Sequence, residues 1–265
     1  MRDSFALWTG RAGSYDRVRP PAPPVLLDLL TQSIAMPRPS LVVDLGSGTG
    51  LSTAIWAERA DRVIGIEPNA DMRSAAMGKV EGHPSAAPIE YRDGLAQQTG
   101  LPDACADIVT AAQSFHWMEP TSTLAEVARI LRPGGLFAAY DYDTPPAIHW
   151  ELDWLAGQVT RRSVALLQER GIAPSGLKIW PRNKSLAPLR ESAEFRFTRE
   201  VFLHSIEQGD AARYLALMQT SALYNPSQFT DEEVGFDSLQ QAAFQFIGSE
   251  PIPWYISYRV RIGVK

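Results

Sequence analysis

Short apolar runs and helical segments alternate through the first half of the chain, and this alternation constrains the fold more than any other feature. The apolar runs are brief and rich in β-branched residues, which predicts buried strands at residues 41–45, 62–67, 89–92, 106–112 and 136–142. Apolar residues at helical spacing predict helices at residues 25–34, 51–60, 69–79 and 121–131. Strands that alternate with helices form a parallel sheet covered on both faces, so we expect an α/β fold.

The second half of the chain is less regular. Helices are predicted at residues 152–167 and 211–223, and a strand at residues 195–204. In the last segment apolar side chains alternate with a more polar set that includes Arg259 and Arg261. This pattern predicts a strand of antiparallel type with one more polar face.

A glycine loop, VVDLGSGTG, joins the first predicted strand to its helix. Gly46, Gly48 and Gly50 would let a ligand lie close to the backbone beyond the strand end. The dinucleotide fingerprint would need a further glycine where this chain has Leu51. Asp44 would repel a pyrophosphate but suits an ammonium group. The loop therefore favours a ligand without phosphate.

Glu67 closes the second predicted strand. A carboxylate at this place can accept hydrogen bonds from both hydroxyls of a ribose. A ligand that has a ribose and an ammonium group but no phosphate fits both strand ends. S-adenosylmethionine is such a molecule.

The segment from about residue 40 to residue 142 resembles the class I S-adenosylmethionine-dependent methyltransferases, in particular the methyltransferase type 11 and trans-aconitate methyltransferase-like group. The resemblance rests on four motifs in the family's order and spacing: VVDLGSGTG, IGIEPNADM, LPDACADIVTAAQSFHWM and LRPGGLFAAYDY. It implies a Rossmann-like, seven-stranded, mostly parallel sheet of order 3-2-1-4-5-7-6 with the last strand antiparallel. It also implies S-adenosylmethionine as cofactor and S-adenosylhomocysteine as product.

The resemblance implies a set of cofactor-binding residues along the first three strand ends and the fourth. They are Asp44, Gly46, Ser47, Gly48, Gly50, Glu67, Pro68, Met72, Leu95, Ala96 and Gln113. The chain departs from many relatives after the third strand, where Leu95 takes an acidic position and Gln97 that of a glutamate. The contact to the adenine amino group then falls to the backbone near Ala96, to Gln97 or to Asp93.

Four residues are candidates for catalysis or substrate binding. His116 follows the fourth strand and could act as a general base, or it could shape its loop by packing. Tyr15 and Arg19 lie in a segment that resembles one folded over the cofactor in the same group. Arg19 could anchor a carboxylate or form a surface ion pair. Tyr140 ends the fifth strand, where its polarity is also ordinary for a strand end.

We expect one methyltransferase domain over residues 1–265. It divides into an N-terminal flap and helix at residues 1–36, a cofactor-binding core at residues 37–143 and 195–265, and an inserted lid at residues 144–194. The predicted reaction is direct in-line methyl transfer to a small-molecule acceptor, which could be a carboxylate, a hydroxyl or an amine. The lid carries three tryptophans and is a candidate for acceptor selection.

Composition narrows the function classes. The 265 residues carry a net charge of -5, which disfavours nucleic acid as the acceptor and with it an RNA methyltransferase. One cysteine, Cys105, allows no intrachain disulfide, and no signal peptide or spanning segment is recognised, so we expect a cytoplasmic protein without membrane partner, monomeric or homodimeric. No His or Cys cluster at ligand spacing indicates a metal. Two alternatives stay open: a cofactor-binding protein without transferase activity, and a dinucleotide oxidoreductase, against which Leu51 and Asp44 argue.

Overall fold

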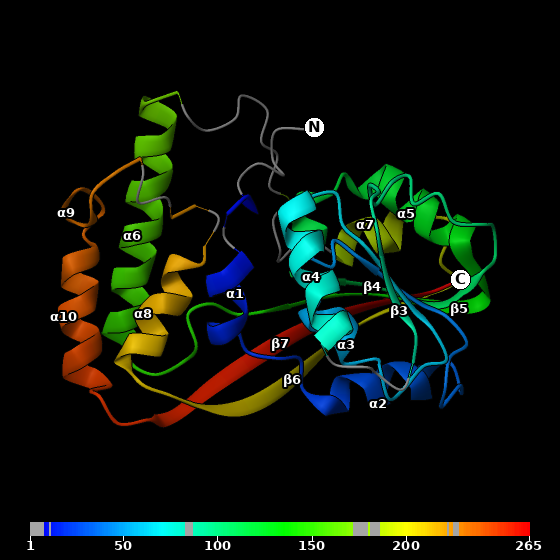
Figure 1. Ribbon diagram of the computed structural model, residues 1–265, viewed down its shortest axis with the longest axis horizontal. Helices are drawn as coiled ribbons and strands as arrows, with labels where there is room; N and C mark the ends of the chain where they lie inside the picture. Colours follow the sequence, from blue (N-terminus) through cyan, green and yellow to red (C-terminus); the bar gives the residue numbers. More distant parts are fainter. Residues whose placement is uncertain are drawn as a thin grey trace. The chain divides into compact units, whose positions relative to one another are not determined.

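The computed structural model describes residues 8–10, 12–82, 87–171, 180, 186–221, 223–224 and 228–265. The chain divides into two compact units. Figure 1 colours the chain along its sequence, so each unit contains segments of several colours. One unit, here the helical unit, comprises residues 1–20, 143–177 and 204–257. The other, here the sheet unit, comprises residues 21–142, 178–203 and 258–265. Every residue predicted to bind the cofactor falls in the sheet unit.

The sheet unit is built on a seven-stranded sheet of order β3-β2-β1-β4-β5-β7-β6. The strands are β1 (Val42–Leu45), β2 (Val63–Ile66), β3 (Ile89–Arg92), β4 (Ala106–Ala112), β5 (Leu131–Tyr142), β6 (Phe197–Gly209) and β7 (Ile252–Val264). Neighbouring strands from β3 to β5 pair in parallel, and β7 runs antiparallel to β5. The predicted fold class and strand order are confirmed.

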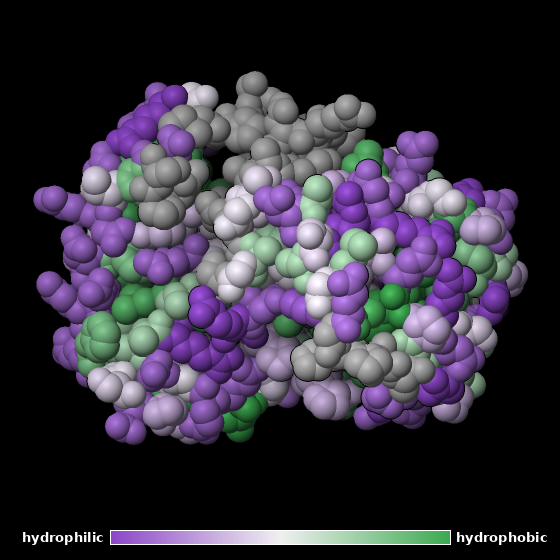
Figure 2. All heavy atoms as spheres, viewed as in Figure 1, coloured by the Kyte–Doolittle hydropathy of each residue, from purple (hydrophilic) through white to green (hydrophobic). Residues whose placement is uncertain are grey.

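Successive residues of a strand point to opposite faces of the sheet, and both faces are buried by packing. Val43 and Val109 pack into a core with Leu124 of the helix α5 (Pro120–Ile130). Val42 and Ile108 pack into a second core, to which α2 (Pro24–Ser33) contributes its buried leucines. The face of the molecule in Figure 2 is mainly hydrophilic, with apolar residues scattered over it. Burial on both faces explains why these strands appear in the sequence as nearly continuous apolar runs.

The predicted helices of the sheet unit are present and differ mainly in length, whereas two short segments at residues 115–117 and 186–191 were not predicted to be helical. The described helices of this unit are α2, α3 (Leu51–Ala54), α4 (Ala70–Gly82), α5, α7 (Leu186–Glu191) and a short 3-10 helix, η2 (Phe115–Trp117). The predicted helix at residues 51–60 ends early because the backbone tightens: the N–H of Trp56 donates to the carbonyl of Thr53, three residues back. β5 begins at Leu131, five residues before the predicted start, because Leu131 already pairs with Ala106.

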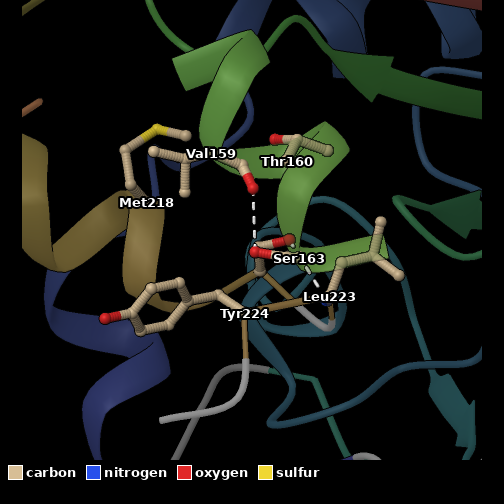
Figure 3. A pocket seen from close by; sticks show the side chains of 7 residues that line it. Val159, Thr160, Ser163, Met218, Leu223 and Tyr224 are labelled. Carbon is tan, nitrogen blue, oxygen red and sulfur yellow. Dashed lines mark hydrogen bonds between the residues drawn. The ribbon is translucent and has the colours of Figure 1, made fainter. Parts of the chain in front are cut away.

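The helical unit contains α1 (Ala12–Val18), α6 (Trp150–Glu169), α8 (Ala211–Gln219), α9 (Asp231–Val234) and α10 (Phe236–Phe246). Its core joins α6, α8 and α10 through residues such as Leu152, Tyr214 and Leu239. Figure 3 shows a small pocket in this unit, and the residues that line it are Val159, Thr160, Ser163, Met218, Ser221, Leu223 and Tyr224. At the start of α6, Trp150 and Trp154 are exposed.

Three described helices of this unit, α1, α9 and α10, were not predicted. α9 begins with a capping box, in which Thr230 accepts from the N–H of Glu233 and the Glu233 carboxylate accepts from the N–H of Thr230. The T-x-x-E spacing was present in the sequence and is the signal that could have located it. α10 follows directly, after Gly235 in a left-handed conformation.

The two compact units have other boundaries than the predicted flap, core and lid. The predicted core at residues 195–265 contributes residues 204–257 to the helical unit, because β6 and β7 continue from one unit into the other. The division into flap, core and lid stays a prediction.

Candidate functional site

The glycine loop follows β1 and is held in a conformation that suits glycine. Gly46, Gly48 and Gly50 all have positive φ, and Gly48 lies at +56°. A Cβ at Gly48 would meet no described atom within 4 Å, whereas a Cβ at Gly50 would lie 2.1 Å from the Tyr91 hydroxyl oxygen. Gly50 is therefore required by packing, and Gly48 leaves open space beside the backbone for a ligand.

Glu67 stands at the end of β2, facing this loop. Its Oε2 accepts from the N–H of Gly48 at 2.8 Å, and its Oε1 accepts from the N–H of Asn69 at 2.8 Å. Burial raises the pKa of Glu67, while the two backbone donors oppose the rise. The carboxylate has about four lone-pair positions and uses two here. It is thus held in place by the backbone and keeps acceptor capacity toward the loop.

Asp44 is fully buried within β1 and accepts three hydroxyl hydrogen bonds. Oδ2 accepts from Ser52 at 2.6 Å and Thr53 at 2.8 Å, and Oδ1 accepts from Thr110 at 2.8 Å. Burial raises the pKa of Asp44 against these hydrogen bonds. The side chain ties the start of α3 and the middle of β4 to the loop strand. Asp44 stands out in the sequence motif, but only the fold shows that it accepts from three hydroxyls on two elements.

The predicted adenine side lies between α4 and the turn after β3. Asn69 caps α4 by accepting from the N–H of Met72 at 3.0 Å. Met72 and Ala96 are buried, whereas Pro68 and Leu95 are half-buried. These residues provide an apolar surface next to Glu67, and their contact with adenine stays a prediction.

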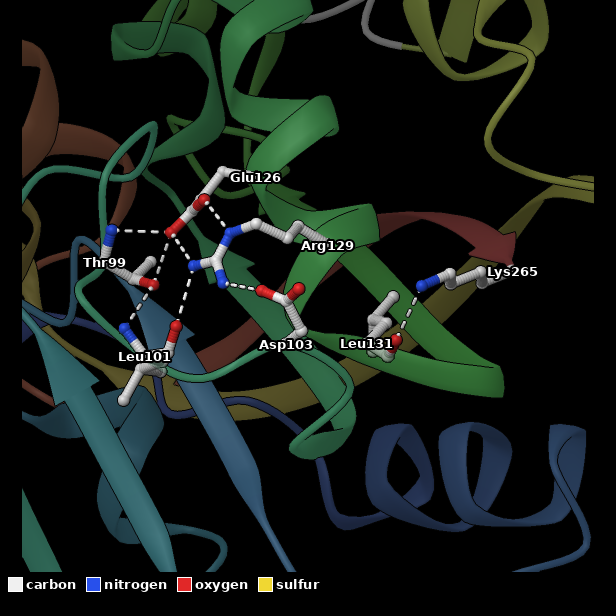
Figure 4. A network of polar contacts seen from close by, with 7 residues as sticks. All are labelled: Thr99, Leu101, Asp103, Glu126, Arg129, Leu131 and Lys265. Carbon is white, nitrogen blue, oxygen red and sulfur yellow. Dashed lines mark hydrogen bonds and ion pairs between the residues drawn. The ribbon is translucent and has the colours of Figure 1, made fainter.

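A polar network fastens the chain after this turn to α5 (Figure 4). The Glu126 carboxylate accepts from the N–H and hydroxyl of Thr99 and from the guanidinium of Arg129. Arg129 also donates to the carbonyl of Leu101 at 2.8 Å and to Asp103. The network holds the stretch from residue 99 to residue 103, which directly follows the predicted adenine contacts.

Replacing Glu126 with Gln should lower the free energy of unfolding by about 1–3 kcal/mol at neutral pH, the usual size for hydrogen bonds to a charged group. Hydrogen bonding from Arg129 leads the effects that lower the pKa of Glu126 to about 2. The ionised form is therefore favoured in the folded state, and its stabilisation is complete above the unfolded pKa near 4.5 and lost as pH falls toward 2.

Urea unfolding measures the free energy of unfolding of wild type and Glu126→Gln. The measurement is made at neutral pH, at about pH 5 and at about pH 3.5. The difference between the two proteins should be constant over the first two conditions and shrink at the third. A difference that does not depend on pH would contradict the ionic role of Glu126.

The loop after β4 carries the candidate base and contacts the glycine loop. Ser114 donates its hydroxyl to the carbonyl of Leu45 at 2.8 Å, and a Cβ at Gly46 would lie 2.8 Å from the Ser114 Cβ. His116 follows in η2, with an imidazole only 3% exposed. Its Nδ1 lies 3.4 Å from Oδ1 of Asp141, at the end of β5. β1 and β4 are neighbours, so this is the switch point of the sheet, where α/β folds bind ligands.

Two buried polar atoms beside the loop have no hydrogen-bond partner among the described residues: Oγ of Ser47 and Oε1 of Gln113. Gln113 has a positive φ of 52°, uncommon for a residue with a side chain, and its Nε2 donates to the carbonyl of Tyr142 at 3.3 Å. Strained backbone and unsatisfied polar atoms are typical of ligand sites. Both residues were predicted to bind the cofactor, and these atoms fit a polar ligand in that place.

The remaining predicted residues are placed as follows. Tyr140 is buried in β5, and burial raises its pKa well above the ordinary value. Arg19 lies in the helical unit, where it donates to the hydroxyl of Thr220 at 3.0 Å and to its carbonyl at 3.1 Å. Both hydrogen bonds lie at the C-terminal end of α8, where a cation is favourable. Tyr15 belongs to α1, and its side chain lies outside the described part of the structure.

A buried ion-pair cluster behind His116 was not predicted. Arg261 in β7 is 1% exposed and donates to Oδ2 of Asp141 at 2.7 Å and to Glu200 of β6 at 3.1 Å. The sequence placed Arg261 on the polar face of the last strand, which predicts exposure. It is buried because that strand lies between β5 and β6, where two acids face it. The signal that could have indicated this burial is an arginine in a largely apolar strand, together with acidic residues in other predicted strands.

The family comparison agrees with this geometry. The family model described as a methyltransferase domain matches residues 43–139. Over these residues the chain is therefore similar to class I methyltransferases. The matched residues contain β2, β3 and β4, most of β1 and β5, the glycine loop, Glu67 and His116.

Relatives match part of the chain in sequence, and a solved structure matches it in fold. An uncharacterized methyltransferase of Mycobacterium tuberculosis is 34% identical over 134 residues, 51% of each chain. The ubiquinone/menaquinone biosynthesis C-methyltransferase of Rubrivivax gelatinosus is 36% identical over 107 residues, covering 39% of this chain and 40% of that protein. The chain thus matches about half the length of its curated relatives or less. The structure of a candidate type II methyltransferase from Anaeromyxobacter dehalogenans matches the fold with a TM-score of 0.65 at 22% identity, over 93% and 97% of the two chains.

Two further observations concern metal ions and membranes. Within the described ranges, no group of three or more His, Cys, Asp or Glu side chains is arranged to hold a metal ion. None of the helices that the structure describes has the length and apolar character needed to cross a membrane.

Proposed function

We propose that the protein transfers the methyl group of S-adenosylmethionine to a small-molecule acceptor by direct in-line displacement. The observation that carries the proposal is the pairing of an open glycine loop with the Glu67 carboxylate at the sheet's switch point. The cofactor supplies an activated methyl group, so the chain mainly has to bind, align and exclude water.

The residues present fit the cofactor part by part. Glu67 is positioned to accept from the ribose hydroxyls, because its two oxygens are fixed by backbone donors and retain acceptor capacity. Met72 and Ala96 offer buried apolar surface to the adenine. The open side of Gly48 and the unsatisfied Oγ of Ser47 and Oε1 of Gln113 suit the methionine part.

The acceptor is proposed only as a small molecule with a carboxylate, hydroxyl or amine. The net charge of -5 supports this over an RNA acceptor, which needs a positive surface. The Rubrivivax relative is named a C-methyltransferase, but the match covers only 40% of that protein. That name therefore does not define the acceptor of this chain.

Isothermal titration calorimetry with S-adenosylmethionine and S-adenosylhomocysteine is the direct test. We expect both to bind with dissociation constants in or below the micromolar range. If neither binds at high micromolar concentration, the proposal is wrong. NADH, titrated by fluorescence, should not bind, and binding of NADH alone would favour an oxidoreductase.

A screen for methyl transfer follows the binding test and separates an enzyme from a protein that only binds the cofactor. S-adenosylmethionine with a labelled methyl group is incubated with the protein and a pool of small carboxylic acids, alcohols, phenols and amines. Labelled product, formed in proportion to S-adenosylhomocysteine, is the expected result. Tight binding without product from any pool would favour the non-enzymatic alternative.

A further inference from the structure

Tyr91 of β3 packs against the glycine loop, and no sequence motif pointed to it. We infer that Tyr91 is a positioning residue of the cofactor site: its ring supports Gly50 and thereby holds the loop in the conformation that binds S-adenosylmethionine. This role rests on the function proposed above and deepens it. Tyr91 acts through the loop and is neither a ligand contact nor a catalytic residue.

The near side of the Tyr91 ring lies on Gly65 of β2. The two residues are partners in the parallel pairing of β2 and β3. A Cβ at Gly65 would lie 2.6 Å from Cδ1 of Tyr91, 2.8 Å from its Cε1 and 2.7 Å from Oγ of Ser47. The φ of Gly65 is not in the left-handed region, so this strand position needs glycine for space and not for conformation. Gly65 thus makes room for both the ring and the loop residue Ser47.

The far end of the ring lies against Gly50, the last glycine of the loop. A Cβ at Gly50 would lie 2.1 Å from the hydroxyl oxygen of Tyr91, 2.8 Å from its Cζ and 3.3 Å from the Cβ of Ala76. Ala76 belongs to α4 and is fully buried. Because an aromatic ring is rigid and this one lies on Gly65, its position limits how closely Gly50 approaches β3.

The hydrogen bonds of the loop hold its first part to the sheet. The N–H groups of residues 46–48 donate to Ile66 and Glu67 at the end of β2, over distances of 2.8 to 3.2 Å. The N–H of Gly50 instead donates within the loop, to the carbonyl three residues before it, at 2.9 Å. The ring of Tyr91 therefore supports the glycine whose N–H closes a turn inside the loop and does not tie it to β2.

This support affects affinity because a ligand binds only the molecules whose loop has the competent conformation. The apparent dissociation constant rises as the competent fraction falls. With the ring in place the loop is formed before the cofactor arrives, so binding does not have to order it. Removing the ring leaves a space beside Gly65 and Gly50 into which the loop can move.

Two substitutions at Tyr91 separate the ring from its hydroxyl. In calorimetry with S-adenosylmethionine, Tyr91→Leu should raise the dissociation constant about 10-fold or more, as expected when about one molecule in ten has a competent loop. Tyr91→Phe keeps the ring and should stay within about threefold of the wild type. The control is Tyr255→Leu, because Tyr255 is exposed and belongs to the helical unit. It should leave the dissociation constant unchanged.

Replacing Gly65 with Ala tests the same contact while Tyr91 is still present. The added Cβ displaces the ring and Ser47, so the dissociation constant should again rise about 10-fold. Alanine is otherwise favoured over glycine inside a strand, so the change is harmless if the ring has no positioning role. The control is Gly78→Ala in α4, where the added Cβ would meet no described atom within 4 Å.

Hydrogen exchange of the loop amides tests the support without cofactor. Exchange at residues 46–50, followed by mass spectrometry, should be about 10-fold faster in Tyr91→Leu and Gly65→Ala than in the wild type. It should be unchanged in Tyr91→Phe and in both controls. Gly65→Ala gives the answer where Tyr91→Leu does not fold.

Three results would overturn the positioning role. They are an unchanged dissociation constant in Tyr91→Leu and Gly65→Ala, a loss of affinity in Tyr91→Phe as large as in Tyr91→Leu, and a lower melting temperature with wild-type affinity and wild-type exchange. Failure of S-adenosylmethionine to bind the wild type would instead overturn the proposed function. The exchange rates would then still decide whether Tyr91 holds the loop.

Discussion

Replacing Glu67 with Gln should weaken the binding of S-adenosylmethionine about 10- to 100-fold. The carboxylate is held by the N–H groups of Gly48 and Asn69 and faces the place proposed for the ribose. A hydrogen bond to a charged group is worth about 1.5–3 kcal/mol, and about 1.4 kcal/mol corresponds to a factor of 10 in affinity. Gln keeps the size of the side chain but removes the charge and one acceptor oxygen.

Calorimetry on wild type, Glu67→Gln and Glu58→Gln measures this effect. Glu58 is an exposed acid beyond α3, so its replacement makes the same chemical change away from the site and should leave the dissociation constant unchanged. A thermal melt of each protein separates lost affinity from lost folding. An unaltered dissociation constant in Glu67→Gln would remove Glu67 from the proposed site.

Replacing Asp44 with Ala should reduce the free energy of unfolding by about 3 kcal/mol or more, and this is the largest stability effect that we expect. The change leaves the hydroxyls of Ser52, Thr53 and Thr110 without their acceptor in a buried place. Each unsatisfied buried group costs about 1–3 kcal/mol. The gain from removing a buried carboxylate, whose pKa burial raises, offsets part of this cost.

Urea unfolding of wild type, Asp44→Ala, Asp44→Asn and Asp61→Ala tests the role. Asp44→Asn retains one acceptor oxygen and should lose less stability than Asp44→Ala. Asp61 is an exposed partner of Arg38, and its replacement should cost less than about 1 kcal/mol. If Asp44→Ala kept the stability of the wild type but lost affinity for S-adenosylmethionine, Asp44 would be a ligand contact and not a structural tie.

The first half of the fold could be predicted because its signals are local. Each strand of the parallel sheet is buried on both faces, so it appears as an apolar run, and a helix or a glycine loop follows it in the chain. The cap at Asn69 and the loop from Gly46 to Gly50 depend on residues a few positions apart. The strand order 3-2-1-4-5-7-6 came from the resemblance to a family and was confirmed by the structure.

The helical unit was predicted less well because its elements depend on one another. α6 was predicted from its own periodicity, whereas α1, α9 and α10 were missed. α8 ends at Gln219, before the predicted end. Their apolar faces are completed by partners such as Leu152 and Tyr214, which are far away in the sequence. Short helices of this kind gain most of their stability from such packing, so periodicity within one segment describes them poorly.

The sequence by itself determined the α/β class, the glycine loop and the acid at the second strand end, because these depend on residues that are close together in the chain. Only the tertiary structure decided which groups share a charge or a hydrogen bond. Asp44 is joined to hydroxyls from α3 and β4, and Asp141 lies between His116 and an arginine that is 120 residues away. Coulomb energy and desolvation depend on distance in space and on burial, and neither can be read from spacing along the chain.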